Sequence, residues 1–221
     1  MVNSTGFKWR ARFAATVTVT ATFAGLMLVP TAFALDVGGV RIDEKIKVAN
    51  QDLVLNGSGL RYAAAGLIRV YVGSLYLQQK RTTSAEISAL KGVKRMHLSL
   101  LREVNSNDFS KGLLGGMRAN LPPAEQQKHF DALLKLGGIF GQIPSLKKGE
   151  TISIDSIPGT GTVVYVNGKK VGDAFPDETF FNALMQIWLG PKPIEESLKP
   201  VLLGVSPSND NSVNNNSRDK F

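Results

Sequence analysis

The chain has 221 residues, of which 43% are hydrophobic, no cysteine, and a formal net charge of +8. The lack of cysteine excludes disulfides, thiol catalysis and cysteine-ligated metal sites, so a hydrophobic core must stabilise the fold. The basic residues form no dense run, which argues against nucleic acid as a partner. The two histidines lie far apart in the sequence, and we therefore expect no metal site and no cofactor.

Residues 1–34 are predicted to be a cleaved signal peptide. Three basic residues in the segment 8–12 precede an uncharged apolar run over 13–29, and residues 32–34 have the A-x-A form of a cleavage site. The run is short for a membrane span of ~20 residues, so an uncleaved anchor is the less favoured alternative. Cleavage leaves a chain that starts at Leu35 and has no integral membrane span, and we expect it to be periplasmic or secreted.

The first elements of this chain are predicted to be short strands. Val40–Ile46 and Gln51–Leu55 have strand composition, and Asn56-Gly57 is predicted to be a tight turn after them. Further on, Ser84–Leu90 is predicted to be a short helix that Ser84 opens, and Val93–Leu101 another strand.

The segment between these regions, Gly59–Leu77, combines apolar strand residues with arginines and tyrosines. Its longest predicted strand covers Leu67–Leu77, with both faces largely apolar, as in a central strand. A charge inside such a strand is costly unless it is paired or faces a ligand. Arg61 and Arg69 are therefore the first candidates for an anion site.

Two helices are predicted to follow. The first begins near Ser106 and ends at Pro122-Pro123, with apolar residues at helical spacing that include Phe109, Leu113 and Met117. The second is predicted over Ala124–Leu136, with Gly137-Gly138 as its stop. The apolar residues of the first helix are read as core or as cleft walls.

The last elements are a hairpin and two helices. Thr151–Ile157 and Thr162–Val166 are predicted to pair, and Asn167-Gly168 to form a second tight turn. Asp177 is predicted to cap a helix over Glu178–Leu189, in which Trp188 is read as a core anchor, and a short helix over Ile194–Leu203 closes the domain. The Asn-rich residues 206–221 are predicted to be a disordered tail.

This order of elements predicts an α+β domain over residues 35–205, an antiparallel sheet covered on one face by helices. His97 and His129 are both predicted to lie on the surface. The sequence contains no G-x-S-x-G motif and no plausible Ser/His/Asp set, so a serine hydrolase is not expected.

Four segments in this order resemble the chalcone isomerase-like superfamily, in particular its exported bacterial branch. They are Arg61–Leu77, Asn107–Asn120, Gly161–Gly168 and Phe180–Gly190. The resemblance implies an open-faced β-sandwich, with a ligand cleft between a large antiparallel sheet and a layer of helices.

The resemblance also implies a binding site. Arg61 matches the arginine that binds the anionic substrate of the plant enzymes, and Tyr71 matches a strand threonine. Phe109 replaces the family's helix tyrosine, Gly116 a helix asparagine and Ile187 a late Thr/Ser. The cation is thus retained while side chains at these last three positions offer no hydrogen-bonding atom.

Such a cleft suits an amphipathic anion, a fatty acid or a polyphenol-like molecule, better than proton transfer. The predicted ligand-binding residues are Arg61, Tyr71, Phe109, Leu113, Met117 and Ile187, with Arg69 and Tyr76 as the fallback pair. Two alternatives stay open: an intramolecular lyase of the chalcone–flavanone isomerase type, and a structural or interaction protein of the cell envelope. Neither the catalytic residues nor the oligomeric state follows from the sequence.

Overall fold

The computed structural model describes Met1, residues 34–64 and residues 66–205. The predicted signal peptide, apart from Met1 and Ala34, and the predicted tail lie outside the described residues. Within these, seven strands form one antiparallel sheet in the order β11-β10-β9-β6-β5-β4-β3. Their bounds are β3 Lys45–Val48, β4 Gln51–Ala63, β5 Ile68–Leu77, β6 Lys94–Leu100, β9 Thr151–Ile157, β10 Gly161–Val166 and β11 Lys169–Lys170.

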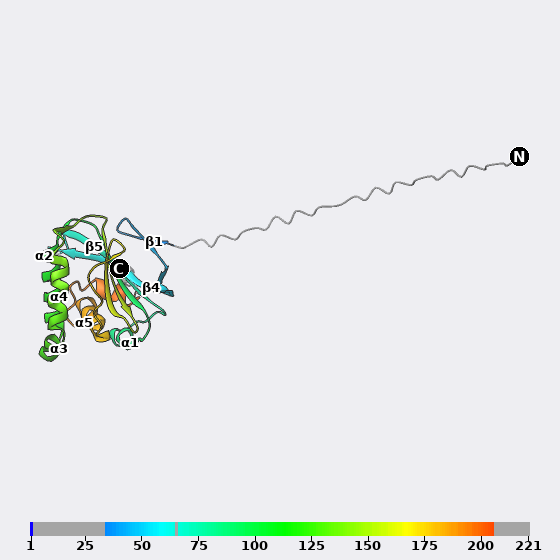
Figure 1. Cartoon of the computed structure of the whole chain (residues 1–221). Helices are drawn as coiled ribbons and strands as arrows, with labels where there is room; N and C mark the ends of the chain where they lie inside the picture. Colours follow the sequence, from blue (N-terminus) through cyan, green and yellow to red (C-terminus); the bar gives the residue numbers. More distant parts are fainter. Residues whose placement is uncertain (2–33, 65, 206–221) are drawn as a thin grey trace, which may run out of the picture. The chain divides into compact units, whose positions relative to one another are not determined.

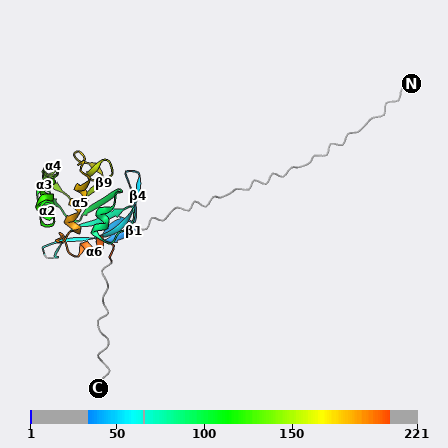
Figure 2. The same ribbon diagram turned by 90° about the horizontal axis from the view of Figure 1, so that it is seen from below.

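The helices gather on one face of this curled sheet. Their bounds are α1 Ser84–Ala89, α2 Ser106–Asn120, α3 Pro123–Lys128, α4 Phe130–Gly141, α5 Glu178–Leu189 and α6 Leu198–Leu202. Helix α5 lies between the sheet and the group formed by α2, α3 and α4 (Figures 1 and 2). Its side chains are buried from Phe180 to Leu189 with few exceptions, as expected of a helix covered on both sides. The α+β architecture predicted from the sequence is confirmed.

The other face of the sheet is covered in part by a small hairpin. Strands β1 (Ala34–Val37) and β2 (Val40–Asp43) pair with each other and contribute Ile42 to a second apolar cluster with Val72 and Tyr76 of β5. A third pair, β7 (Val104–Asn105) and β8 (Ser145–Leu146), joins the start of α2 to the loop before β9. Because side chains alternate across a strand, residues of β5 contribute to both cores.

Several predicted boundaries are confirmed by the cap and turn geometry. Asp177 accepts a hydrogen bond from the Thr179 backbone N–H at 2.8 Å, as a helix N-cap does. Asn167 and Gly168 have positive φ angles and join β10 to β11. At α1 the cap is Thr83 rather than Ser84, and it forms a capping box with Glu86.

The prediction of a turn at Asn56-Gly57 was wrong, because both residues lie inside β4. The register of β4 against β5 shifts between Leu55 and Gly57, which is a β-bulge. The Asn56 side chain is buried and donates to the carbonyls of Arg81 and Leu202. The chain instead turns before β4, at Ala49 and Asn50, which both have positive φ. Asn56 and Gly57 therefore allow α6 to pack closely against β4, because Asn56 bonds to the Leu202 carbonyl and a Cβ on Gly57 would clash with the Val201 backbone.

The predicted end of the second helix was also wrong. The region divides into α3 and α4 around His129, and α4 continues through Gly137-Gly138 to Gly141. Leu136 and Phe140, on either side of the glycines, are almost fully buried. Their packing offsets the low helix propensity of glycine, roughly 1 kcal/mol per residue relative to alanine.

Candidate functional site

A cavity of about 210 Å³ lies between the sheet and the helices. Strands β4 and β5 form one wall, α2 and α5 form the opposite one, and residues before α2 and after α5 complete the rim. Its lining is apolar apart from a small number of side chains. The lining residues are Arg61, Val70, Tyr71, Val104, Asp108, Phe109, Gly112, Leu113, Ile187, Trp188 and Ile194.

Arg61 supplies a cation to this cavity. It is half-buried on β4, directly opposite Tyr71 of β5, and its guanidinium carbon lies 5.8 Å from the centre of the Tyr71 ring. Its Nε is buried, and none of the residues that the structure describes accepts a hydrogen bond from it. Within the described part of the chain, no carboxylate oxygen lies within ion-pair distance of Arg61. A partly buried guanidinium without an anion is suited to bind one.

A bulge in β5 determines which residues reach the cavity. Arg61 pairs with Tyr71, but the next residue, Tyr62, pairs with Arg69, so Val70 is the extra residue. Val70 and Tyr71 consequently both belong to the core on the helical side, although they are neighbours. The strict alternation expected of a regular strand would have placed only one of them there.

Tyr71 supplies a hydrogen-bond donor beside the arginine. Its hydroxyl accepts a hydrogen bond from Trp188 Nε1 at 2.8 Å, deep in the core. Burial, with a small contribution from the nearby Glu195 carboxylate, raises the pKa of Tyr71 to about 12, against the lowering effects of the Trp188 hydrogen bond and of Arg61. The phenol is therefore protonated at neutral pH, and its own proton can be donated to a ligand in the cavity.

The helical wall is apolar and closely fitted. Phe109 and Leu113 of α2 are buried, and Phe109 contacts Phe140 of α4 edge to face. A Cβ on Gly116 would lie 2.8 Å from Cγ2 of Ile187, so glycine here allows α2 to approach α5 closely. A Cβ on Gly112, in contrast, would meet no atom within 4 Å. Gly112 thus leaves open the space that forms part of the cavity.

The structure brings most of the predicted site residues together. Arg61, Tyr71, Phe109, Leu113 and Ile187 all line this one cavity. Met117 does not; it is fully buried in the main core cluster.

The fallback residues lie elsewhere. Arg69 is exposed near the start of β5. Tyr76 belongs to the apolar cluster on the other face of the sheet, where its hydroxyl donates to the Asp43 carbonyl at 3.0 Å.

Sequence reasoning missed the role of Trp188 in the cavity. Trp188 is buried, as a core anchor would be, but it also lines the cavity and holds the Tyr71 hydroxyl. A buried indole N–H needs an acceptor, and this requirement was the available signal for a polar partner. Val70 gave no signal, because its position depends on the bulge.

The predictions for both histidines were wrong. His97 is half-buried, its Nδ1 lies 2.8 Å from Ser153 Oγ, and burial, with a smaller effect of Arg95, lowers its pKa to about 4. His129 is 1% exposed. Its Nε2 lies 3.5 Å from Glu125 Oε2 and its Nδ1 lies 3.4 Å from Asp177 Oδ2. His97 was expected at the surface because it shares a strand face with Arg95 and Ser99, and His129 because Lys128 and Asp131 lie close to it in the sequence.

The face of the sheet that bears His97 also carries a buried ion pair. Arg95 Nε and Nη2 donate to the two carboxylate oxygens of Asp155, each at 2.6 Å. Asp155 is fully buried, and its partner occupies both of its oxygens. This bidentate pair is thus saturated and joins β6 to β9.

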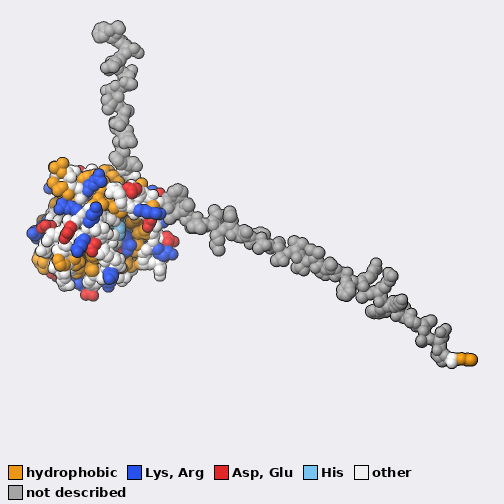
Figure 3. Space-filling model, turned by 90° about the horizontal axis from the view of Figure 1, so that it is seen from above, with side chains coloured by type: hydrophobic (Ala, Val, Ile, Leu, Met, Phe, Trp, Pro, Cys, Tyr) orange, Lys and Arg blue, Asp and Glu red, His pale blue; other side chains and the backbone are white. Residues whose placement is uncertain are grey.

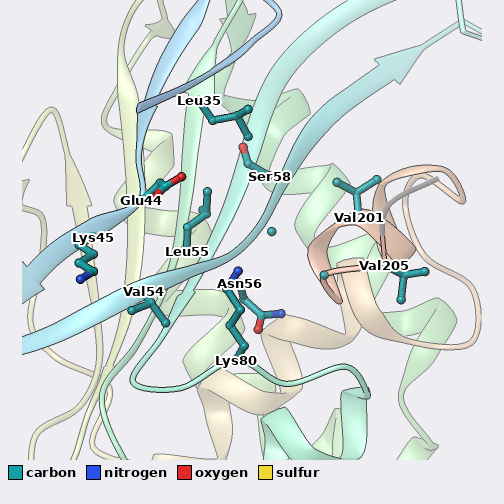
Figure 4. Close-up of a pocket in the computed structure, with 12 residues that line it drawn as sticks. Leu35, Glu44, Lys45, Val54, Leu55, Asn56, Ser58, Lys80, Val201 and Val205 are labelled. Atoms are coloured by element: carbon teal, nitrogen blue, oxygen red, sulfur yellow. The ribbon is translucent and has the colours of Figure 1, made fainter. Parts of the chain in front are cut away.

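A larger groove of about 440 Å³ lies between β3, β4 and α6. Figure 4 shows Glu44 and Leu55 on one side of it and Val201 and Val205 on the other. Its buried polar side chains have partners: Asn56 is bonded to backbone groups, as described above, and Ser58 Oγ lies 2.8 Å from Ser74 Oγ. Among the described residues that line the groove, the charged ones, Glu44, Lys45 and Lys80, are exposed, whereas Arg61 in the smaller cavity is partly buried.

The described residues form neither a metal-binding cluster nor a membrane-spanning helix. Across residues 34–64 and 66–205, no cluster of three or more His, Cys, Asp or Glu side chains could hold a metal ion. No helix in the same ranges is long and apolar enough to cross a bilayer. Lys and Arg side chains are spread among hydrophobic ones on the face shown in Figure 3.

Comparisons with known proteins agree with this architecture. A family model described as chalcone isomerase-like matches residues 34–204. The crystal structure of a fatty-acid binding protein of Arabidopsis thaliana superposes with a TM-score of 0.55 at 16% sequence identity. The match covers 75% of this chain and 92% of that chain, and at this identity it shows the fold alone. No curated protein matches the chain significantly.

Proposed function

Because the chain belongs to the chalcone isomerase-like family, we propose that it binds a small amphipathic anion, most simply a fatty acid, in the Arg61 cavity. One observation carries this proposal. A partly buried guanidinium with no anionic partner among the described residues lies beside a protonated phenol, at one side of a cavity whose remaining wall is largely apolar. A carboxylate attached to an alkyl chain complements both parts.

Recognition follows from the donors on the sheet. The ligand carboxylate would accept hydrogen bonds from the Arg61 guanidinium and from the Tyr71 hydroxyl, whose oxygen accepts the Trp188 N–H with one of its lone pairs. Charge-assisted bonds of this kind are worth about 1.5–3 kcal/mol each. The alkyl chain would lie against Phe109, Leu113 and Ile187, at about 0.8 kcal/mol for each buried methylene.

The size of the cavity restricts the ligand. At about 210 Å³ it is larger than an apolar cavity of about 150 Å³ that accepts benzene, yet below the roughly 300–1,000 Å³ of typical sites for drug-sized ligands. A short or medium alkyl chain fits this range better than a polyphenol of three rings.

The lining favours binding over catalysis. Phe109, Gly112 and Ile187 face the cavity from the helical side and carry no polar side-chain atom. Apart from Trp188, which is bonded to Tyr71, Asp108 at the rim is the only polar side chain that the described residues contribute on that side, and it is exposed. Proton transfer during ring closure needs a positioned acid or base near the reacting atoms, and a tyrosine whose pKa is about 12 is a weak base. We therefore propose a non-catalytic protein.

The name of the Arabidopsis protein is consistent with this proposal, since it is described as a fatty-acid binding protein of the same fold. We further propose that the chain is exported after cleavage behind Ala34. Cell fractionation and N-terminal sequencing test this part separately. A chain found outside the cytoplasm and starting at Leu35 is expected, and a chain that retains residues 1–34 would contradict it.

The binding site is tested by comparing its two candidate arginines. Displacement of a fluorescent fatty acid by decanoate is measured for the wild type, Arg61→Gln and Arg69→Gln. We expect Arg61→Gln to weaken decanoate binding about 10- to 100-fold, the range of one charge-assisted bond, and Arg69→Gln to change it less than about twofold. Loss in Arg69→Gln alone would place the anion at the exposed arginine instead. Acceleration of chalcone ring closure by the wild type would refute the non-catalytic assignment.

A further inference from the structure

The connection between β4 and β5 carries exposed aliphatic side chains. Leu67 is 86% exposed and its neighbour Ile68 is 38% exposed, while Val70, two residues further along β5, is almost fully buried. Single exposed aliphatic residues are common on protein surfaces, but two adjacent ones at a projecting hairpin form a small apolar tip. We call residues 66–68 the hairpin tip; β4 and β5 form the cyan hairpin in Figure 1.

Two exposed arginines lie beside this tip. Arg69 follows it directly and is exposed. Leu101 donates its backbone N–H to the Val70 carbonyl at 2.9 Å, which brings the exposed Arg102 beside Arg69 on the adjacent chain segment. In the described ranges neither arginine forms an ion pair with a carboxylate.

The loop before β9 extends the positive charge. Gly149 donates its backbone N–H to the Leu100 carbonyl at 2.8 Å, so the exposed Lys147 and Lys148 lie near the same end of the sheet. The carboxylate of Glu150, in the same loop, already accepts hydrogen bonds from the Lys147 backbone and from Asn167. Glu103, which follows Arg102, is exposed as well, so at this end of the sheet its carboxylate accompanies four exposed cations, Arg69, Arg102, Lys147 and Lys148.

The tip also adjoins the cavity. Arg61 and Val70 line the cavity, and the tip is the continuation of their two strands. At roughly 3.3 Å per strand residue, Leu67 lies about 10 Å beyond Val70. Val104, another lining residue, follows Arg102 by two positions. The apolar tip and its cations thus stand at the rim on the Arg61 side, where the carboxylate of a ligand would lie.

We propose that the hairpin tip docks on the surface of an anionic lipid bilayer. Leu67 and Ile68 enter the interfacial region, and Arg69 and Arg102 contact the phosphates of the headgroups. An exposed apolar tip with cations beside it is complementary to such a surface. A second copy of the chain is a poorer partner, because a symmetric contact through the tip would bring the same arginines together.

The purpose of docking rests on the proposed function. A protein that holds a fatty acid must exchange it with membranes, where most fatty acid resides. Docking at the Arg61 side would let the ligand pass between bilayer and cavity with little exposure of its alkyl chain to water. Docking itself, however, is tested without any fatty acid.

The experiment measures co-sedimentation with vesicles. The exported chain, with its N-terminus defined by intact mass, is mixed with phosphatidylcholine vesicles containing about 30 mol% phosphatidylglycerol at about 0.1 M salt. We expect binding that weakens on raising the salt, and a loss of about tenfold in Leu67→Glu and in Arg102→Glu. No binding by the wild type would overturn the proposal.

Two matched variants control for charge alone. Leu134→Glu replaces an exposed leucine of α4, which is 59% exposed, and Arg118→Glu an exposed arginine of α2. Each changes the net charge as its counterpart does, and each should retain vesicle binding within about twofold. Equal losses in the tip and control variants would show general electrostatic attraction and overturn the assignment to the tip.

A solution assay separates this proposal from the proposed function. Leu67→Glu and Arg102→Glu should bind decanoate in solution as the wild type does, while Arg61→Gln should lose decanoate yet sediment normally with vesicles. The wild type and all variants could fail to bind decanoate while vesicle binding is lost only in the tip variants. In that case the proposed ligand is wrong and the docking proposal stands. Dimers that form through the tip and are abolished by Leu67→Glu, without vesicle binding, would identify a self-association surface and refute lipid docking.

Discussion

Removing one oxygen atom from the cavity wall should affect both stability and binding. In the Tyr71→Phe variant the ring remains, so packing against β4 and α5 is kept. The hydroxyl that accepts the Trp188 Nε1–H bond at 2.8 Å is lost. Trp188 is 2% exposed, so its N–H cannot turn to bulk water and is left without a partner.

The expected loss of stability in Tyr71→Phe follows from the unpaired Trp188 N–H. A buried donor deprived of its acceptor costs about 1–3 kcal/mol, and we take about 2 kcal/mol for the free energy of unfolding. For a domain of this size the melting temperature should fall by about 4–8 °C. Decanoate, if it accepts a hydrogen bond from Tyr71, should bind about 10- to 100-fold more weakly, as expected for the loss of a charge-assisted bond worth about 1.5–3 kcal/mol.

A double-mutant cycle tests whether the cost of Tyr71→Phe depends on Trp188, with the free energy of unfolding measured by circular dichroism in urea. Tyr71→Phe should cost about 2 kcal/mol in the wild type but less than about 1 kcal/mol in a Trp188→Phe background, where no indole donor remains to be orphaned. Tyr62→Phe removes a half-buried hydroxyl for which the described residues offer no hydrogen bond, and should be nearly neutral. An equal cost of Tyr71→Phe in both backgrounds would refute the account of the Tyr71–Trp188 pair.

Three further predictions concern the cavity, the ion pair and His97. Gly112→Leu should fill the open space in the cavity and reduce decanoate binding at least tenfold. Gly115→Leu on the same helix should leave decanoate binding unchanged. Equal binding by the two variants in the displacement assay would contradict the assigned cavity. Arg95→Met should lower the urea-unfolding free energy by about 3–5 kcal/mol, because it leaves the fully buried Asp155 unpaired, and a loss below about 1 kcal/mol would contradict this. The pKa of His97 is about 4 in the folded state, below its usual value of 6.5, which applies to the unfolded chain. The folded protein therefore binds this proton more weakly, and the free energy of unfolding should fall as the pH drops from above 6.5 towards 4. Between pH 7 and 4.5 the wild type should lose about 2 kcal/mol more than His97→Gln, and parallel pH curves would contradict it.

The sequence predicted the parts of the fold that depend on local patterns. Alternating apolar residues, the Asn167-Gly168 turn and the Asp177 cap each require only a few neighbouring residues, and each is confirmed. The wrong boundaries share a different cause. Asn56-Gly57 stays in a strand because α6, far along the chain, packs on it, and Gly137-Gly138 stays helical because buried neighbours hold the helix.

The candidate site was predictable only in part for the same reason. The arginine and the apolar positions on α2 and α5 follow from residue types and from the family resemblance. The bulge that places Val70 beside Tyr71, and the hydrogen bond from Trp188, arise only when β4, β5 and α5 come together. The burial of His129 likewise depends on Asp177, which lies far from it in the sequence.

A crystal structure of the chain grown with decanoate would test the central claim most directly. We expect the carboxylate to lie within about 3 Å of both the Arg61 guanidinium and the Tyr71 hydroxyl, with the alkyl chain against Phe109 and Leu113. Decanoate bound instead in the groove between Leu55 and Val201, with the Arg61 cavity empty, would contradict it.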